Sequence, residues 1–324
     1  MENKNRLTII TPFYKAEKYI EDCIKSLLDQ DLEEVQYIFV NDGSPDDADK
    51  IVQKYAEKDK RMLLLTKENG GQSSARNMAM KYANGEYILY VDADDYLEPN
   101  VLGTMVKAAE DNSLDILRAI ICDVKGDEKI QIDELDNPGT VMTGRERLSH
   151  NMISYSLCAH MYRRDFLFKN NIVFMEGVYH EDMDYVPRTL YYAKRVMDLD
   201  LFFYDYVVVE GSTTNHYSLK RVEDVYRVAV NVSEFVDKEV SADDYDNYFR
   251  EYLAFMFAHV ISLCIVSGHS LKDFLASGNK KPEVLKHLKT SKQKKYKLLG
   301  IMLKLKLYKL YTRMYLLREK KVEK

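Results

Sequence analysis

The chain has 324 residues, of which 46% are hydrophobic and 31% are charged, and its formal net charge is −5. This composition excludes collagen-like, low-complexity and wholly disordered proteins, and a length prior of ~150 residues per domain predicts two units, or one domain with a long extension. The four cysteines, at positions 23, 122, 158 and 264, fit neither a disulfide framework nor a metal-ligand spacing. We therefore expect a reducing, cytoplasmic compartment.

Two further patterns bear on membranes and secretion. The apolar run after the N-terminus is too short for the core of a signal peptide, so none is predicted. No segment reaches the ~18 uninterrupted apolar residues that a spanning helix needs, because even the stretch 252–266 is broken by His259 and Ser262. We therefore expect no membrane-crossing segment.

The first part of the chain alternates strand and helix patterns. Parallel strands with right-handed crossovers follow from such a βαβαβαβ series, and ligands of these sheets bind beyond the carboxyl ends of the strands. The predicted strands are 7–11, 35–40, 62–66 and 87–91, and the apolar spacing predicts helices over 20–28, 48–56 and 75–83.

The mixed strand and helix patterns continue to about residue 217, and only helical patterns follow. The patterns predict a helix over 99–110, a strand over 116–124, a polar surface excursion over 125–139, a helix over 181–193 and an apolar segment over 201–209. From about residue 219 onward every segment is typical of helix. We therefore predict an α/β domain over residues 1–217 and a helical C-terminal region over residues 218–324.

Polar side chains follow the predicted strands at the points where the strands end. Asp42 follows the second strand, and Asp92 and Asp94 follow the fourth. Carboxylates that gather at one sheet edge repel one another unless a cation or a donor-rich ligand compensates them. Mg²⁺ and Mn²⁺ prefer oxygen ligands and keep positions open for phosphates, so this edge is a candidate site for such an ion with a phosphorylated ligand.

Each of these patterns also has a purely structural interpretation. The segment 92–95 suits a turn and helix N-cap, and the segment 42–45 suits a turn that leads into a helix. The segment 68–77 contains two glycines and a Ser cap before a helix N-terminus, whose free N–H groups favour anions, and Arg76 lies on the first turn. Neither interpretation is excluded for any one segment alone.

Taken together, these segments resemble a known family. Pro12-Phe13-Tyr14, Asn41-Asp42-Gly43-Ser44, Asn69-Gly70-Gly71 with Ala75-Arg76-Asn77, and Val91-Asp92-Ala93-Asp94-Asp95 are similar in order and spacing to the signatures of inverting family 2 glycosyltransferases with the GT-A fold. The resemblance covers about residues 6–217. It implies an α/β, GT-A type fold with a mixed, mainly parallel sheet flanked by helices.

The resemblance implies roles for individual residues. Pro12 and Tyr14 would line the nucleotide base, Asp42 would hydrogen-bond the base, and Arg76 would lie near the nucleotide. Asp92 would contact the ribose or the metal shell, and Asp94 would bind a Mn²⁺ or Mg²⁺ ion that bridges the diphosphate. The candidate residues for binding the substrate or nucleotide are Thr11, Pro12, Tyr14, Glu17, Asp42, Asn69, Gly70, Arg76, Asp92 and Ala93. The family commonly has Asn where this chain has Lys15.

The segment 179–185 supplies a candidate catalytic base. Its Glu181-Asp182 pair is similar to the Glu-Asp motif of the family, in which a carboxylate takes the proton from the acceptor hydroxyl. An inverting transfer needs one such base opposite the leaving diphosphate. We favour Asp182 over Glu181, although acidic residues are also favourable at a helix N-terminus without any catalytic role. Downstream, the segment 211–216 resembles the family's mobile loop, and His216 is a candidate metal ligand or an ordinary surface histidine.

The C-terminal tail is strongly basic. Residues 291–324 contain 12 Lys and Arg against 2 Asp and Glu, interspersed with leucines and tyrosines. Such a helix suits an anionic membrane surface, which would make the protein peripheral at the inner face of the membrane, but it also suits packing on the body with lysine stems over apolar surface. Nucleic-acid binding is not expected, because the body is acidic and no nucleic-acid motif accompanies the tail.

The sequence thus predicts an inverting glycosyltransferase that moves a sugar from a nucleotide-sugar donor, a UDP-sugar by family analogy, to a hydroxyl of a surface glycan or lipid-linked acceptor. One alternative is a phosphatase of the haloacid dehalogenase type, because Asp92-Ala93-Asp94 follows an apolar strand; Tyr96, where that motif expects Thr or Val, counts against it. A second alternative is a non-catalytic protein that binds nucleotide-sugars or glycans.

Overall fold

The computed structural model describes residues 5–125, 128–132, 135, 137–149, 156–207 and 218–322. The chain divides into two compact units. Unit 1 comprises Met1–Gly177 and Glu181–Glu210, and unit 2 comprises Val178–His180 and Gly211–Lys324. The boundary expected at residue 217 borders a segment outside the described residues, so its position stays a prediction.

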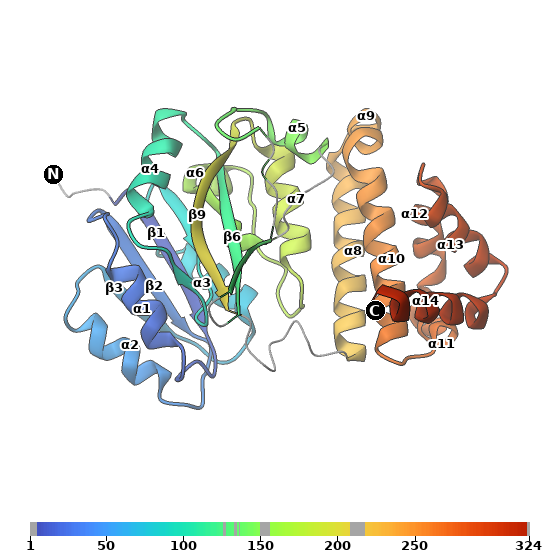
Figure 1. Cartoon of the computed structure of the whole chain (residues 1–324), viewed down its shortest axis with the longest axis horizontal. Helices are drawn as coiled ribbons and strands as arrows, with labels where there is room; N and C mark the ends of the chain where they lie inside the picture. The colour runs from blue at the N-terminus through green and yellow to red at the C-terminus, as the bar shows by residue number, and fades with distance from the viewer. Residues whose placement is uncertain are drawn as a thin grey trace. The chain divides into compact units, whose positions relative to one another are not determined.

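Unit 1 is built on one mixed sheet of nine strands in the order β3-β2-β1-β4-β8-β6-β9-β5, with β7 paired to β6. Figure 1 shows helices on both faces of this sheet. The strands are β1 (Leu7–Phe13), β2 (Val35–Asn41), β3 (Met62–Thr66), β4 (Tyr87–Tyr90), β5 (Tyr96–Leu97), β6 (Ile116–Lys125), β7 (Glu128–Gln131), β8 (His160–Arg163) and β9 (Val196–Val207).

The strands β3, β2, β1 and β4 are parallel, as the alternating pattern predicts. All seven residues of β1 are buried, because helices cover both faces of a parallel sheet and the strand reads as a continuous apolar run. Phe13 pairs with Asn41 at the end of β1, so the loops after β1 and β2 leave the sheet side by side. The predicted polar residues therefore meet at one edge.

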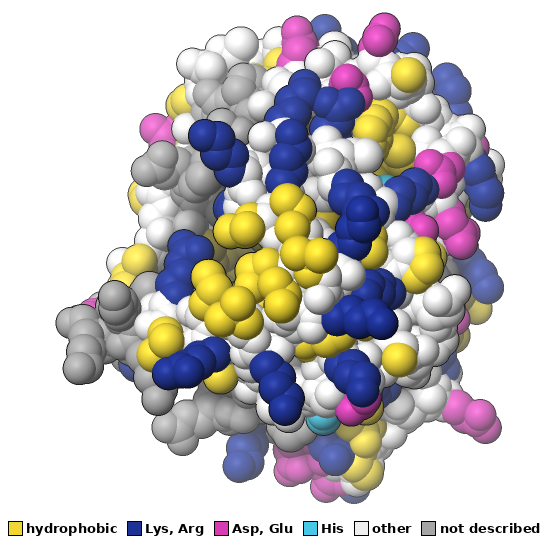
Figure 2. All heavy atoms as spheres, turned by 90° about the vertical axis from the view of Figure 1, so that its right-hand side faces the viewer, with side chains coloured by type: hydrophobic (Ala, Val, Ile, Leu, Met, Phe, Trp, Pro, Cys, Tyr) yellow, Lys and Arg dark blue, Asp and Glu magenta, His cyan; other side chains and the backbone are white. Residues whose placement is uncertain are grey.

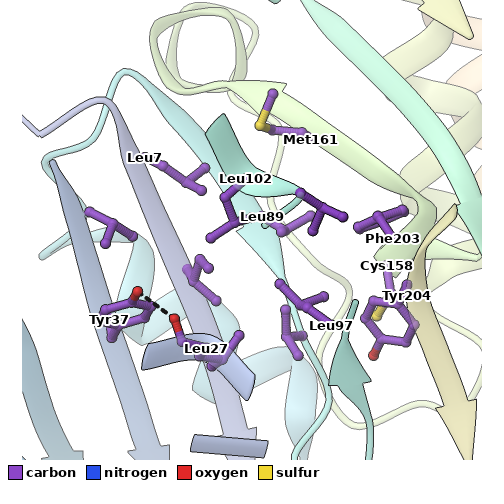
Figure 3. Packing of buried hydrophobic residues seen from close by; sticks show 14 of the residues in the cluster. Leu7, Leu27, Tyr37, Leu89, Leu97, Leu102, Cys158, Met161, Phe203 and Tyr204 are labelled. Atoms are coloured by element: carbon purple, nitrogen blue, oxygen red, sulfur yellow. Dashed lines mark hydrogen bonds between the residues drawn. The ribbon is translucent and has the colours of Figure 1, made fainter. Parts of the chain in front are cut away.

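The main core lies between the sheet and the helices α1, α2 and α4 (Figure 3). Buried apolar side chains of α1, such as Leu27, contact those of β1 and β2, and the hydroxyl of Tyr37 donates a hydrogen bond to the carbonyl of Leu27 at 2.6 Å. The helices of unit 1 are α1 (Ile20–Leu28), α2 (Ala48–Ala56), α3 (Gln72–Met80), α4 (Leu102–Asp111), α5 (Gly144–Ser149), α6 (Arg164–Lys169) and α7 (Asp182–Tyr192), with a 3₁₀ turn at Leu157–Ala159.

The other side of the sheet carries an aromatic cluster. The rings of Phe174 and Tyr185 stack at 3.9 Å between centroids, and the ring of Tyr90 on β4 packs edge-on against both. Offset and edge-to-face contacts of this kind add to the burial of large side chains. The cluster joins β4 to α7 and supports the start of α7, where the Glu181-Asp182 pair lies.

The structure departs from the sequence patterns mainly after β4. The expected helix over 99–110 begins later, at Leu102, and the polar excursion contains a short exposed strand, β7, which pairs antiparallel with β6. The short strand β8 was not predicted; it lies antiparallel between β4 and β6. Together with β5 and β7, which also pair antiparallel, it makes the sheet mixed. The pattern did not reveal β8, because a strand of four residues flanked by irregular segments leaves little periodic signal.

Unit 2 is helical in its described residues. Its long helices are α8 (Leu219–Glu239) and α10 (Arg250–Val266), which bury apolar side chains such as Val228 and Phe257. Ser218 caps α8 by accepting a hydrogen bond from the amide of Arg221. The other elements are α9 (Ala242–Asp244), a π turn (Tyr245–Phe249), α11 (Leu271–Ala276), a 3₁₀ turn (Ser277–Asn279), α12 (Lys281–Thr290), α13 (Lys294–Lys304) and α14 (Tyr308–Val322).

One helical run, Ala242–Val266, is long and apolar enough to cross a membrane. The most apolar 18 residues of this run are 67% buried inside the structure. Core helices of soluble proteins can have the same length and composition. This run alone is therefore weak support for a membrane span.

Candidate active site

The loops after β2 and β3 are joined through the carboxylate of Asp42. This side chain is buried, and it accepts hydrogen bonds from the ammonium of Lys67 at 2.8 Å and from the amides of Gly70 at 3.0 Å and Gly71 at 2.7 Å. The amides precede α3, so Asp42 compensates the positive end of that helix as well as the lysine. In this structure Asp42 therefore orders the glycine loop.

Close backbone packing accompanies this carboxylate. Gly43 has a φ of +68°, and a Cβ at this position would lie 2.7 Å from the backbone nitrogen of Asn69. The side-chain amide of Asn69 donates to the carbonyl of Asp42 at 2.8 Å. Only glycine combines this left-handed conformation with so close an approach, which explains the Asp-Gly sequence at the end of β2.

The predicted residues of the first loop lie beside the β2 loop. Thr11 and Pro12 are buried at the end of β1, and the hydroxyl of Thr11 has no hydrogen-bond partner within the described part of the chain. Tyr14 is 46% exposed, and the ammonium of Lys15 lies over its ring. Glu17 is exposed and accepts a hydrogen bond from the amide of Asp47 at 3.4 Å. These residues lie at or just beyond the end of β1, at the same sheet edge as the β2 loop.

Arg76 on α3 lies between two carboxylates from distant parts of the chain. Its guanidinium forms ion pairs with Asp92 at 2.6 Å and with Glu181 at 2.5 Å. The side chain of Gln72, one turn earlier on α3, also donates to Glu181 at 2.6 Å. The structure therefore brings three predicted residues, Arg76, Asp92 and Glu181, into one contact network.

The network is almost closed to solvent at its centre. Arg76 is only 2% exposed, and its guanidinium lies over the ring of Phe174 at 5.6 Å from the centroid. Burial lowers the pKa of Arg76, but Asp92 and Glu181 raise it by more, so the net shift is upward. One oxygen of Glu181, Oε2, is buried without a partner in the described residues. The charge of Glu181 is therefore stabilised through its other oxygen.

The segment after β4 also carries two carboxyl groups, those of Asp94 and Asp95, that form no ion pair among the described residues. Asp94 is exposed, and desolvation by the surrounding loops, with the nearby charge of Asp92, raises its pKa to about 6. Asp95 is buried, and desolvation followed by repulsion from Asp92 and Asp94 raises its pKa to about 8. Asp95 accepts hydrogen bonds from the hydroxyl of Tyr204 at 2.7 Å and the amide of Val207 at 2.8 Å. Ala93, which stands between Asp92 and Asp94 in the sequence, is buried.

The carboxylates after β4 can be compared with the oxygen ligands that a divalent cation requires. Within the described residues no group of three or more His, Cys, Asp or Glu side chains is arranged to hold a metal ion. Asp92 already pairs with Arg76, which leaves Asp94 as the carboxylate open to solvent. One or two carboxylates with substrate phosphates form a common Mg²⁺ or Mn²⁺ environment. Asp94 and Asp92 would therefore suit an ion whose remaining ligands are the phosphates of a bound diphosphate.

The two members of the Glu181-Asp182 pair have different surroundings. Glu181 is tied to Arg76 and Gln72, whereas Asp182 accepts a hydrogen bond only from the amide of Met183, at 2.9 Å, among the described contacts. Desolvation, followed by the negative charge of Glu181, raises the pKa of Asp182 to about 7. At neutral pH Asp182 can therefore both hold and release a proton.

The segment before the acidic pair contacts the start of α8 within unit 2, and one predicted residue of the site cannot be placed. His216 falls outside the described residues. Arg221, in unit 2, donates a hydrogen bond to His180 at 2.8 Å, and burial lowers the pKa of His180 to about 4. His180 has a φ of +63°, so the backbone turns sharply just before the acidic pair.

Sequence reasoning did not single out several residues of the site. Lys67, Gln72 and Tyr204 hold Asp42, Glu181 and Asp95 respectively. Gln72 could have been found, because it precedes Arg76 by four residues and so lies on the same helix face. The pairing of Lys67 with Asp42 and of Tyr204 with Asp95 depends on the register of the sheet, which the local sequence does not reveal.

Known proteins resemble this chain in sequence and in structure. Residues 8–169 match the family described as Glycosyl transferase family 2. The uncharacterized glycosyltransferase EpsJ of Bacillus subtilis is 34% identical over 207 residues, which cover 62% of this chain and 60% of EpsJ. The structure of Staphylococcus aureus TarS 1-349 in complex with UDP has a TM-score of 0.72 and 23% identity, and the match covers 97% of this chain and 91% of that one.

A more distant structure has the same fold. The mannosyltransferase PcManGT of Pyrobaculum calidifontis, in complex with GDP-Man and Mn²⁺, has a TM-score of 0.53 and 16% identity, with 98% of this chain and 88% of that one covered. The family match spans half of the chain, so the chain belongs to glycosyl transferase family 2. The GT-A fold expected from the sequence is confirmed. The chain spans about 60% of the length of EpsJ.

The Arg76 network generates a stability prediction. We expect Arg76→Ala to lower the free energy of unfolding by about 3–5 kcal/mol, because Glu181 would remain buried without its partner. Thermal and urea unfolding measure the change. Lys107→Ala is the control, since the Lys107–Asp111 pair is exposed on α4 and contributes little. Equal melting temperatures for the two variants would contradict a structural role for the buried ion pairs.

Proposed function

We propose that this chain is an inverting glycosyltransferase that moves a sugar from a UDP-sugar to a hydroxyl of a surface glycan or its lipid-linked precursor, on the cytoplasmic side of the membrane. Family membership supports the reaction class. The similarity in fold to TarS, which was crystallised with UDP, supports the choice of nucleotide. The four cysteines are free and buried, which suits a reducing compartment.

The single observation that carries the proposal is the contrast between Glu181 and Asp182. Glu181 is held by an ion pair with buried Arg76, so its carboxylate is already engaged within the protein. Asp182 has no such partner among the described residues, and its pKa of about 7 matches that of an effective general base at neutral pH. Asp182 is therefore the proposed base, and Glu181 is a positioning residue.

The proposed reaction is a single displacement. The oxygen of the acceptor hydroxyl forms a bond with the anomeric carbon as the bond from that carbon to the diphosphate oxygen breaks. Asp182 takes the hydroxyl proton, and the electron pair of the broken bond leaves with the nucleoside diphosphate. Attack opposite to the leaving group inverts the anomeric centre, which is why one base is sufficient.

The remaining residues would bind and orient the donor. Tyr14 and Pro12 would contact the base, and Asp42 would accept a hydrogen bond from it, with the glycine loop close to the nucleotide. Asp94, with Asp92, would hold a Mn²⁺ or Mg²⁺ ion, which when bound would neutralise the charge of the leaving diphosphate. The position of Asp94 supports this role, since it is exposed and forms no ion pair among the described residues, while Asp92 follows the same strand.

The metal assignment predicts the behaviour of Asp94→Ala. We expect this variant to fold, but to lose the increase in melting temperature that UDP with Mn²⁺ produces in the unchanged protein. A ligand at 100 times its dissociation constant stabilises a protein by ~2.7 kcal/mol, which a thermal-shift assay detects. Asp22→Asn is the control, because Asp22 is an exposed carboxylate on α1. An unchanged Mn²⁺-dependent shift in Asp94→Ala would reject the assignment.

The base assignment predicts opposite effects for the two acidic residues. Asp182→Asn should bind UDP normally while single-turnover transfer falls by ~10²–10⁴, the usual contribution of a general base. Glu181→Gln should mainly lower the melting temperature, because it weakens the ion pair with buried Arg76. A nearly active Asp182→Asn beside an inactive, stable Glu181→Gln would move the base to Glu181.

The pKa of Asp182 also predicts a pH dependence. Transfer should rise with pH around a midpoint near 7 and level off above it, because the base must be ionised. The folded pKa lies above the unfolded value of ~3.9, so this group's contribution to stability is present at low pH and is lost as pH rises through about 7. Asp182→Asn should therefore lack the rise of transfer with pH. Its melting temperature should also not fall as the pH rises through about 7, as that of the unchanged protein should. A flat profile in the unchanged protein would contradict the assignment.

A further inference from the structure

Unit 2 exposes an unusual number of large apolar side chains near its C-terminal end. Leu305, Leu310, Met314 and Leu317 are 61%, 50%, 48% and 55% exposed. They lie on α14 and on the turn that precedes it. Contiguous exposed apolar patches are rare on monomeric soluble proteins and mark interaction surfaces.

The preceding helix, α13, also has an exposed apolar side. The helix α13 already packs inward through Leu299, Met302 and Leu303, which are nearly completely buried. Its other leucine, Leu298, and Ile301 point away and are 53% and 52% exposed. The outer face of the helix thus carries apolar side chains among its exposed lysines, and these apolar side chains need a separate explanation.

A hollow of about 880 Å³ lies at this surface, between the start of α11 and α14. Leu271, Leu307 and Leu310 contribute to its apolar wall, and Lys272, Lys309 and Arg313 contribute to its lining. We call this region, with the exposed apolar side chains of α13 and α14, the basic–apolar surface.

Positive charge surrounds the apolar side chains. Figure 2 shows an apolar patch with Lys and Arg side chains distributed around it and few acidic groups close by. Lys272, Lys309 and Arg313 are exposed, and in the part of the chain that the structure describes they form no ion pair. Basic side chains without acidic partners around an apolar centre are complementary to an anionic, amphipathic surface.

We propose that the basic–apolar surface docks on a lipid bilayer that contains anionic phospholipids. The leucines would enter the boundary between headgroups and acyl chains, while the lysine and arginine side chains contact the phosphates. This proposal goes beyond the proposed function and does not depend on the donor or the acceptor. A second copy of the chain fits less well, because the same unpaired cations would face one another across the interface.

The charge component can be tested by reversing three cations. We expect Lys272→Glu/Lys309→Glu/Arg313→Glu in the full chain to bind phosphatidylglycerol-containing vesicles about 100-fold more weakly at low salt, since each cation at such a surface contributes roughly a fivefold change. Cosedimentation with vesicles measures the partition coefficient. Vesicles of phosphatidylcholine alone should bind the unchanged protein weakly, and added salt should weaken its binding to the anionic vesicles.

The matched control has the same change in charge at another place. Lys54→Glu/Lys58→Glu/Lys60→Glu alters three exposed lysines of unit 1 around the end of α2. This variant should bind vesicles as the unchanged protein does. Equal losses in both variants would mean that net charge alone governs binding, and the proposed surface would be rejected.

The apolar component has an independent test, because the chain contains no tryptophan. Leu310→Trp places a single indole on the surface, and Tyr82→Trp places one on an exposed position of unit 1. Anionic vesicles should shift the emission of Leu310→Trp to the blue, and lipids brominated in their acyl chains should quench it. The emission of Tyr82→Trp should change in neither case.

Two outcomes of the tryptophan experiment would also overturn the proposal. One is an unchanged Leu310→Trp emission with anionic vesicles at low salt. The other is a blue shift that depends on protein concentration without lipid, with a dimer in sedimentation velocity that Leu310→Gln dissociates; the surface would then be an interface between copies. Because the tryptophan variant retains the native charges, it tests the proposal even if the triple charge variant fails to fold.

Discussion

The candidate site depends on the compensation of buried charge by one side chain, Arg76. This residue on α3 is bound to Asp92, which follows β4, and to Glu181, which precedes α7, so it joins three elements that are distant in sequence. A buried guanidinium with only one partner would be costly, and so would Glu181 without Arg76. The ion pairs therefore fix the start of α7 relative to the sheet edge, which also fixes the position of Asp182.

The same compensation divides the carboxylates into two groups with different chemistry. Asp92 and Glu181 have a cationic partner, whereas Asp94, Asp95 and Asp182 have none among the described contacts and have raised pKa values. The ion pairs hold Asp92 and Glu181 in position. Groups without one can exchange a proton or accept a cation near neutral pH, and such perturbed groups gather at functional sites.

Much of this arrangement could be predicted from the sequence, because it depends on local patterns. The parallel strands β1 to β4 and the helices between them follow from periodicity, and the order of short motifs indicated the family. The antiparallel strand β8 could not be predicted, since its four residues have no periodic signal of their own. The contacts of Lys67 with Asp42 and of Tyr204 with Asp95 join residues 25 and 109 positions apart, and only the sheet register determines them. The different surroundings of Asp182 and Glu181 likewise depend on the position of Arg76, which the local sequence does not reveal.

If Asp42 has its proposed role, the hydrogen bonds that it already accepts bear on the choice among nucleobases. Its carboxylate accepts hydrogen bonds from Lys67 and from two glycine amides, so a base that binds there has to displace or share these donors. An ionised carboxylate can only accept, which means that a pyrimidine with a protonated ring nitrogen, as in uracil, can make this exchange. Cytosine presents a lone pair at the same ring position and would leave the carboxylate facing another acceptor. Under the proposed role of Asp42, discrimination between the two pyrimidines would arise from repulsion of the wrong base as much as from attraction of the right one.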